Sequence, residues 1–397
     1  MIVPGDTRQT VLVELTGPDR PGITAGLMLL LASADAGVQD VEQIIIRGRL
    51  SLSLVVEVPM GKDLIKELLH FGWEQGVEVD FSIVDSVPSS RRPGLVVTLV
   101  GTTVSPADFA AVAATIAAHG ANIDRIVRLA RYPVMAYELA VSGDPLEALR
   151  HDLLAVADSL PADLAVHREG LGRRAARLVV LDVDSTLIQD EVIELVARHA
   201  GTEDEVRAVT DRAMKGELDF TESLHARVAT LAGLDASVLD QVHEEVRFTP
   251  GARTFIRTLH RLGFHTAIVS GGFTAVTDKL AAELGIGHAY ANTLEVVDGK
   301  LTGKVVGDVV DRAGKAAILH RIADEHGVAL DQVVAVGDGA NDLDMLNAAG
   351  LGVAFNAKPV VQEAADTALN VPYLDAILFV LGVRREEIEA AEAADAG

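Results

Sequence analysis

The segment from Arg177 to Ile188 constrains the fold of this chain most, because an apolar run ends there in two acids. Residues 178–181 are typical of a strand buried in a parallel sheet, and Asp182 and Asp184 follow at once. Open α/β sheets bind ligands at the carboxyl ends of their strands. Acids two residues apart project from the same face, so they can hold one Mg²⁺ while one acts as a nucleophile. An acidic loop in an acidic protein is the alternative.

Composition narrows the class of protein further. With 397 residues the chain is expected to form two or three domains. Its net charge of −24 argues against nucleic acid and anionic membranes as partners. The absence of cysteine excludes disulfides and thiol catalysis and fits a reducing cytoplasm, where we expect the protein. We see no signal peptide, and the longest apolar stretch, residues 23–32, is too short to span a bilayer.

The N-terminal part contains a repeat of about 80 residues with the order strand, helix, strand, strand, helix, strand, which is a ferredoxin-like unit. In the first unit, residues 1–86, we expect these elements at 10–15, 23–36, 41–47, 50–58, 62–76 and 77–84. In the second unit, residues 93–170, we expect them at 95–100, 106–119, 123–129, 135–141, 145–160 and 163–168. A polar segment that contains prolines, residues 86–93, links the two units.

Strands alternate with helices in the third block, residues 176–383, which predicts a doubly wound parallel sheet with helices on both faces. The charged, helical insertion at 189–246 lies between the first two strands, so we expect it to form a cap over their carboxyl ends. A small β-flap is expected within 290–310. The tail, residues 384–397, is expected to begin as a helix and to fray into disorder.

Two further motifs follow in order. Ser270 and Gly271 come directly after an apolar strand, where a hydroxyl and backbone N–H groups can hold phosphate oxygens at a helix start. A simple turn is the alternative. Lys315 opens a predicted helix, residues 316–326, and opposes its dipole, so it needs a reason to be there. Pairing with phosphate and with Asp182 would supply one, and a solvated surface lysine is the alternative.

The last motif, residues 336–342, also follows an apolar strand. Asp338 would complete a metal site with Asp182 and Asp184, Asn341 can reach phosphate or metal-bound water, and Asp342 can orient Lys315. Few ligands, all of them oxygen, suit one Mg²⁺ per active site, and histidine or cysteine clusters for zinc are absent.

The order of these four motifs resembles the haloacid-dehalogenase superfamily over about residues 176–383. Phosphoryl transfer needs a nucleophile and a proton for the leaving oxygen, roles that fall to Asp182 and Asp184. In that superfamily, the second acid is present in the members that act as phosphatases or phosphomutases.

The cap resembles the phosphoserine phosphatase family in residues 190–191, 213–220 and 223–228. The resemblance implies that Glu191 faces the substrate amino group, Arg227 binds its carboxylate, and Met214 and Phe220 wall the pocket. It implies Mg²⁺-dependent hydrolysis of O-phospho-L-serine through a phosphoaspartyl intermediate, the last step of serine biosynthesis. An ordinary ion pair of Glu191 with Arg227 on a charged cap is the alternative.

The two N-terminal units resemble ACT domains, which often bind amino acids and pair across chains. The first keeps the turn at residues 17–22, where Asp19 and Gly22 are candidate ligand-binding residues because a glycine lets a ligand approach the N–H groups of a helix start. The second has a different turn, residues 101–106. The resemblance implies feedback inhibition by L-serine and a homo-oligomer, most simply a dimer, formed through the ACT domains. A purely structural dimerisation module is the alternative.

Three other functions stay open. A phosphatase could act on a phosphoprotein or on another small phosphomonoester, and a sensor could carry an inert phosphatase-like domain. A phosphomutase is the third, although the amine- and carboxylate-reading residues of the cap indicate release of serine.

Overall fold

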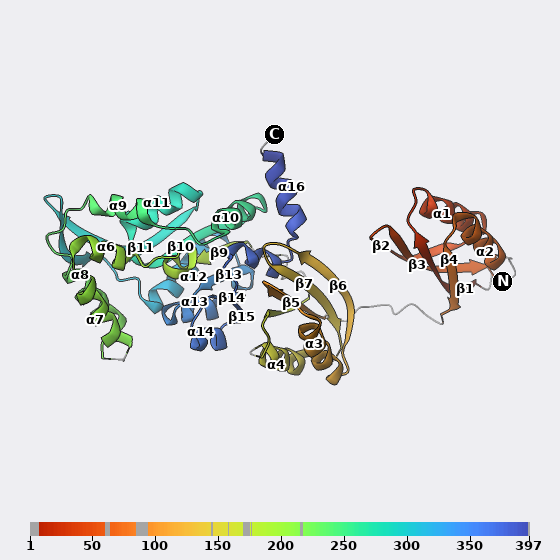
Figure 1. Ribbon diagram of the computed structural model, residues 1–397, viewed down its shortest axis with the longest axis horizontal. Coiled ribbons are helices and arrows are strands. Elements are labelled where there is room, and N and C mark those ends of the chain that lie inside the picture. Colours follow the sequence, from red (N-terminus) through yellow and green to blue (C-terminus); the bar gives the residue numbers. More distant parts are fainter. Residues whose placement is uncertain are drawn as a thin grey trace, which may run out of the picture. The chain divides into compact units, whose positions relative to one another are not determined.

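The structure is a computed structural model, and it describes residues 8–59, 64–84, 94–143, 146–157, 159–169, 175, 177–214 and 217–395. The chain divides into two compact units, Met1–Arg91 and Arg92–Gly397 (Figure 1). No described helix is long and apolar enough to cross a membrane.

The first unit has the expected order of elements. It consists of β1 (Arg8–Pro18), α1 (Ile23–Ser33), β2 (Gly37–Ile46), β3 (Arg49–Pro59), α2 (Leu64–Gln75) and β4 (Glu78–Ile83). Its antiparallel sheet has the order β2-β3-β1-β4. Every second residue of β3 from Leu50 to Val56 is buried, and these side chains share a core with α1 and α2. The alternation places one face of the sheet against the helices.

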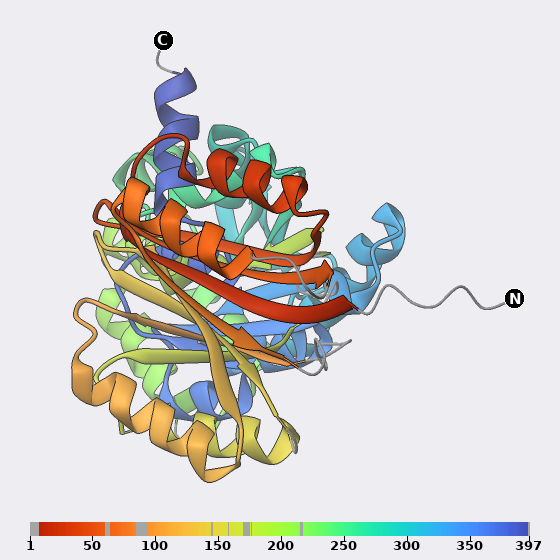
Figure 2. The same ribbon diagram turned by 90° about the vertical axis from the view of Figure 1, so that its right-hand side faces the viewer.

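The second unit begins with the same order. It contains β5 (Leu95–Gly101), α3 (Pro106–Ala118), β6 (Asn122–Ala130), β7 (Met135–Ser142), α4 (Leu146–Ala157) and β8 (Asp163–Arg168). Figures 1 and 2 show α3 and α4 covering one face of this part of the sheet. All seven residues of β5 are buried. Its other face is covered as well, because Val100 belongs to the large core cluster that also contains Val179 and Phe379.

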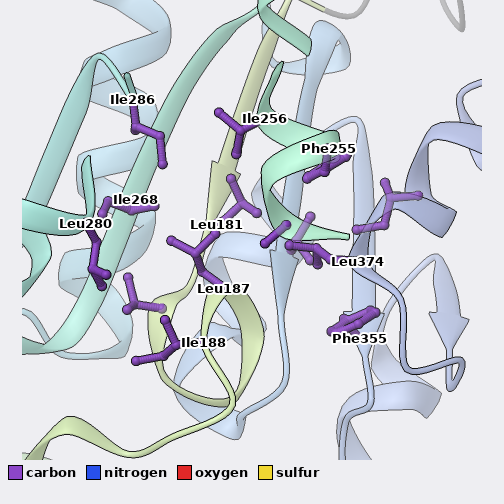
Figure 3. Packing of buried hydrophobic residues seen from close by; sticks show 14 of the residues in the cluster. Leu181, Leu187, Ile188, Phe255, Ile256, Ile268, Leu280, Ile286, Phe355 and Leu374 are labelled. Carbon is purple, nitrogen blue, oxygen red and sulfur yellow. The ribbon is translucent and has the colours of Figure 1, made fainter. Parts of the chain in front are cut away.

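A parallel sheet follows, as expected. Its strands are β9 (Leu178–Leu181), β10 (His265–Phe273), β11 (His288–Val297), β13 (Val333–Gly337), β14 (Leu351–Phe355) and β15 (Thr367–Leu369), and β12 (Lys300–Val306) forms the predicted flap with β11. Alternate residues of β9 belong to two cores on opposite faces. Leu181 packs near Ile256 of α10 (Ala252–Arg261) (Figure 3). The other core contains residues of α12 (Arg312–His326) and α13 (Leu343–Ala348), so the doubly wound fold is confirmed.

The two parts of the second unit share one sheet. Strand β8 pairs antiparallel with β15, which joins eleven strands in the order β12-β11-β10-β9-β13-β14-β15-β8-β5-β7-β6. The backbone N–H and side-chain Nδ2 of Asn370 donate to the two oxygens of Asp163 over 2.7 and 2.9 Å. Arg150 and Asp366 form an ion pair of 3.1 Å across the same seam. The sequence pattern did not predict this junction.

Four helices form the expected insertion between β9 and β10: α6 (Val192–Ala200), α7 (Glu203–Met214), α8 (Phe220–Ala229) and α9 (Val238–Glu245). The tail forms α16 (Arg385–Asp395). The prediction that the tail frays is wrong as far as Asp395, because Glu392 accepts a hydrogen bond from Thr254 of α10 and Asp395 pairs with Arg261.

Candidate active site

Asp182 lies where β9 ends in the middle of the parallel sheet. Its N–H donates to the carbonyl of Val336 over 2.8 Å, which continues the pairing of β9 with β13. The chain then turns tightly, with Ser185 in the left-handed region at φ 56°. The turn directs the Asp184 carboxylate toward two donors: the N–H of Val192 at 2.7 Å and the hydroxyl of Ser270 at 3.0 Å. Burial raises the pKa of Asp184, although these hydrogen bonds oppose the rise.

Lys315 lies beneath the site with no exposed surface. Its Nζ donates to Oδ1 of Asp182 and to Oδ1 of Asp342, each over 2.6 Å. Burial alone would lower the pKa of Lys315, but the two carboxylates raise it above its ordinary value. The lysine therefore stays charged and fixes the orientation of Asp182, and the structure brings these three residues together as the sequence suggested.

A cluster of three carboxylates marks the candidate metal centre. Ligand atoms of Asp182, Asp338 and Asp342 lie within 4.8 Å of one another. Both oxygens of Asp342 already accept hydrogen bonds, from Lys315 and from the N–H of Gly339 at 3.0 Å. Asp182 and Asp338 are therefore the side chains with oxygen atoms to offer a cation. The Asp184 carboxylate, which we expected as the third ligand, accepts hydrogen bonds from Val192 and Ser270, and its role at the metal stays a prediction.

The electrostatics of this cluster fit a divalent cation. Burial, and then the Asp342 carboxylate, raise the pKa of Asp182 well above its ordinary range. The same two causes raise the pKa of Asp338 to about 6. Buried carboxylates crowded together repel each other, and a bound cation relieves that repulsion. Carboxylate oxygens are the ligands that Mg²⁺ prefers, so the donor set suits it.

The carboxyl-terminal end of β10 forms the side of the site expected to face phosphate. The Ser270 hydroxyl oxygen accepts the N–H of Gly272 over 2.7 Å. A Cβ on Gly271 would lie 3.0 Å from the Phe220 ring, so a larger residue there would press on the pocket wall. Asn292, which sequence reasoning missed, donates to the carbonyl of Gly271 over 2.8 Å and is fully buried. A lone asparagine in a strand of the flap was the only signal that could have drawn attention to it.

A cavity of about 620 Å³ opens above these groups. Its lining includes most residues predicted for the site: Asp182, Asp184, Glu191, Phe220, Arg227, Gly271, Asp338 and Asn341. Ser270, Lys315 and Asp342 are buried and do not line it. The side chain of Met214 lies outside what the structure describes. Sequence reasoning missed five polar or charged lining residues: Glu194, Thr210, Ser223, Arg312 and Lys358.

The cap contributes opposite charges to this cavity. Burial, and then the nearby Asp184, raise the pKa of Glu191 to about 7, while the hydroxyl of Ser185 donates to Glu191 Oε1 over 2.9 Å. Burial lowers the pKa of Arg227 from its ordinary value, and Glu191 and Asp184 act against that shift. A desolvated acid and a desolvated guanidinium in one cavity are suited to a ligand that carries both an ammonium and a carboxylate. The candidate regulatory residues Asp19 and Gly22 belong to the first unit.

Family models match three segments of the chain. The model of the haloacid dehalogenase-like hydrolases matches residues 179–347, and two ACT domain models match residues 9–82 and 94–167. The fold and the site thus define a haloacid dehalogenase-like hydrolase with two ACT domains.

Comparison with known proteins shows to which family of these hydrolases the chain belongs. The chain is 58% identical to a phosphoserine phosphatase of Streptomyces coelicolor over 96% of this chain and 94% of the relative. It is 49% identical to the phosphoserine phosphatase SerB2 of Mycobacterium tuberculosis, over 98% and 97% of the two chains. A solved structure of a probable phosphoserine phosphatase from Vibrio cholerae, in unliganded form, is 37% identical with a TM-score of 0.57 and covers 75% of this chain and 89% of that chain. The chain belongs to the phosphoserine phosphatase family, which confirms the resemblance seen in its motifs.

Proposed function

We propose that the chain hydrolyses O-phospho-L-serine to L-serine and phosphate, with Mg²⁺ and through a phosphoaspartyl intermediate, as the last step of serine biosynthesis in the cytoplasm. The observation that carries this proposal is the cavity that places Glu191 and Arg227 of the cap above the Lys315–Asp182 pair. These four groups offer an acid for the ammonium, a guanidinium for the carboxylate, and a cation beside the nucleophile for the phosphate.

Lys315 prepares the nucleophile. It binds Oδ1 of Asp182 and leaves Oδ2 to attack phosphorus, so the new P–O bond forms as the bond to the serine oxygen breaks. Asp184 gives its proton to the departing serine oxygen, a role that suits a carboxyl group whose pKa is raised by burial. Asp184 then takes a proton from the water that hydrolyses the phosphoaspartate. Mg²⁺, held by Asp182 and Asp338, would neutralise phosphate charge.

Binding of the amino acid part would use the cap. Arg227 can grip the carboxylate with two parallel N–H donors. Glu191 would face the ammonium, and that positive charge would favour the ionised form of an acid whose pKa is about 7 without it. A phosphomonoester that lacks either group would leave Glu191 or Arg227 buried without a partner, which is the usual source of strong discrimination.

Phosphate release from O-phospho-L-serine, measured with Mg²⁺, tests the proposal. Asp182→Asn should reduce kcat by about 10³-fold or more, because no nucleophile remains. Asp278→Asn, which changes an exposed acid of α11 (Thr274–Leu284), is the matched control and should leave the rate unchanged. Release from other phosphomonoesters but not from phosphoserine would contradict the substrate assignment. No release from any of them would favour the sensor.

Regulation by L-serine is the second part of the proposal. Helix α1 begins at Ile23 after the N-cap residue Gly22, which has φ 97°; it has no side-chain cap and no acidic residue in its first turn. The N–H of Asp19 donates to the carbonyl of Gly48 over 2.8 Å, which fixes the turn. Such a helix start can accept a carboxylate. We propose that serine binds there in a homodimer formed through the ACT domains and favours a less active state. Serine that changes neither rate nor molecular mass would refute this part.

A further inference from the structure

Two strand-like linkers connect the cap to the parallel sheet and lie side by side. Ile188 of the outgoing linker forms an antiparallel bridge with Phe248 of the returning one. The N–H of Gln189 donates to the carbonyl of Arg247 over 2.9 Å, and the N–H of Thr249 donates to the carbonyl of Leu187 over 3.0 Å. The two linkers thus pair as a short two-stranded segment, residues 187–190 and 247–249, which we call the hinge.

One side chain binds the far end of this hinge. Asp190 accepts three hydrogen bonds from Arg247: from the backbone N–H at 2.9 Å, from Nη2 at 2.7 Å and from Nε at 3.3 Å. The Asp190 side chain is only 12% exposed, although that of Arg247 is 68% exposed. Burial would raise the pKa of Asp190, but the hydrogen bonds and charge of Arg247, with a smaller effect of Arg198, hold it below its ordinary value. We call this pair the hinge clasp.

The hinge clasp is one residue away from groups that face the substrate. Glu191 follows Asp190 and forms the N-cap of α6, while the next N–H, of Val192, donates to the catalytic acid Asp184. Ser185, next to Asp184, donates its hydroxyl to Glu191. The backbone that carries Glu191 is thus held on one side by the catalytic turn and on the other by Arg247.

We infer that Asp190 is a positioning residue for substrate recognition: the hinge clasp holds the cap so that Glu191 faces the ammonium of the substrate. This inference rests on the function proposed above. An ordinary exposed ion pair would contribute little. The hinge clasp differs because its acid is nearly buried and because it joins the two linkers through a backbone N–H. Its loss leaves the backbone hydrogen bonds of the hinge in place, so the fold should persist while the position of Glu191 becomes variable.

Steady-state kinetics with two substrates tests the inference. Asp190→Asn and Arg247→Gln should each raise KM for O-phospho-L-serine about fivefold to tenfold, because hydrogen bonds to a charged group are lost. For p-nitrophenyl phosphate, which has no ammonium for Glu191 to bind, kcat/KM should change less than about twofold. The effects of the two changes should not add in the double variant, since both break the same side-chain ion pair. Amide hydrogens of residues 192–196 should exchange faster in both variants.

The matched control is Asp204→Asn, which removes an exposed 3.5 Å pair with Arg207 elsewhere on the cap and should leave both substrates unaffected. An equal loss with both substrates, or an unchanged KM for phosphoserine, would overturn the inference. If Asp190→Asn fails to fold, Arg247→Gln on an exposed side chain still decides the question. A wild type that does not cleave phosphoserine would instead refute the proposed function before any variant is compared.

Discussion

The two ACT units have one order of elements but use their sheets differently. In the first unit, three of the eleven residues of β1 are buried, and the sheet ends with β2 and β4 at its edges. In the second unit, all seven residues of β5 are buried, and β8 continues into the catalytic sheet. A βαββαβ unit covers only one face with its own helices. The comparison teaches that the sheet face left uncovered by these helices matters: an ACT unit becomes part of a larger domain when other elements of the chain cover that face.

The helix starts of the two units differ as well. Helix α1 has no side-chain cap. Helix α3 is closed by its own residues, because Ser105 accepts the N–H of Asp108, and Asp108 in return accepts the N–H of Ser105. A start closed in this way has fewer free donors for a ligand. Of the two units, the first therefore has the uncapped helix start that the proposed serine site requires.

Deletion of each ACT unit should give the largest difference between the two in activity and stability. Without residues 1–91, the remaining chain should keep its activity, and its midpoint of thermal unfolding should stay within roughly 4 °C, the shift that about 1 kcal/mol produces. Without residues 94–170, the edge of β15 and core residues such as Phe379 lose their cover, so no soluble enzyme is expected. Circular dichroism and phosphate release measure both. An active enzyme after the second deletion would contradict the shared sheet.

Substitutions at the start of β8 and of β4, the last strands of the two ACT units, should affect the stability of the protein differently. Asp163→Ala removes the acceptor for the backbone and side chain of Asn370, so the free energy of unfolding should fall by about 1–3 kcal/mol. Glu78→Ala, at the corresponding exposed start of β4, should change it by less than about 0.5 kcal/mol. Urea unfolding gives both values. Equal losses would show that the seam does not stabilise the second unit specifically.

The two helix starts offer a smaller contrast. Gly22→Ala places a Cβ on backbone at φ 97° and should cost about 1 kcal/mol while abolishing inhibition by serine. Ser105→Ala removes a helix cap at a similar cost of about 1 kcal/mol, but inhibition by serine should persist. Serine titrations of the initial rate distinguish the two. Normal inhibition of the Gly22 variant would exclude this turn as the ligand site.

The smallest effect on stability is expected at the sheet edges. Ile45 of β2 is 50% exposed and Ile126 of β6 is 51% exposed, so a lysine at either place should change the free energy of unfolding by less than about 0.5 kcal/mol. Only Ile45→Lys should weaken the proposed dimer, because β2 is an edge strand with several exposed apolar side chains. Light scattering reports the mass. If Ile126→Lys dissociated the dimer instead, the dimer interface would have to lie in the second ACT unit.

The sequence predicted the fold and the gathering of the site because both depend on local patterns. Asp182, Ser270 and Asp338 each follow an apolar run, and neighbouring parallel strands bring their ends together. Lys315 could be linked to the acids because a lysine at a helix start needs negative partners. These arguments need no knowledge of distant contacts.

The remaining features depend on contacts that no local pattern encodes. Periodicity shows that a strand is buried but not which edge it joins, so the pairing of β8 with β15 was missed. The sequence also did not reveal the hydrogen bonds from Val192 and Ser270 to the Asp184 carboxylate, which depend on the left-handed turn at Ser185. The contacts of Asn292 and the pairing of Asp190 with Arg247 depend on which segments meet in space, which residue spacing does not reveal.

The pairing of Asp163 with Asn370 also sets an order of events during synthesis. The two residues are 207 positions apart, so at 5–20 residues per second the ribosome needs roughly 10–40 s to supply the partner. The first unit holds all its strands early and can fold at once. Strand β8 must wait with an open edge until nearly the whole chain has been made, which makes the second unit the part of this protein most exposed to wrong pairing in the cell.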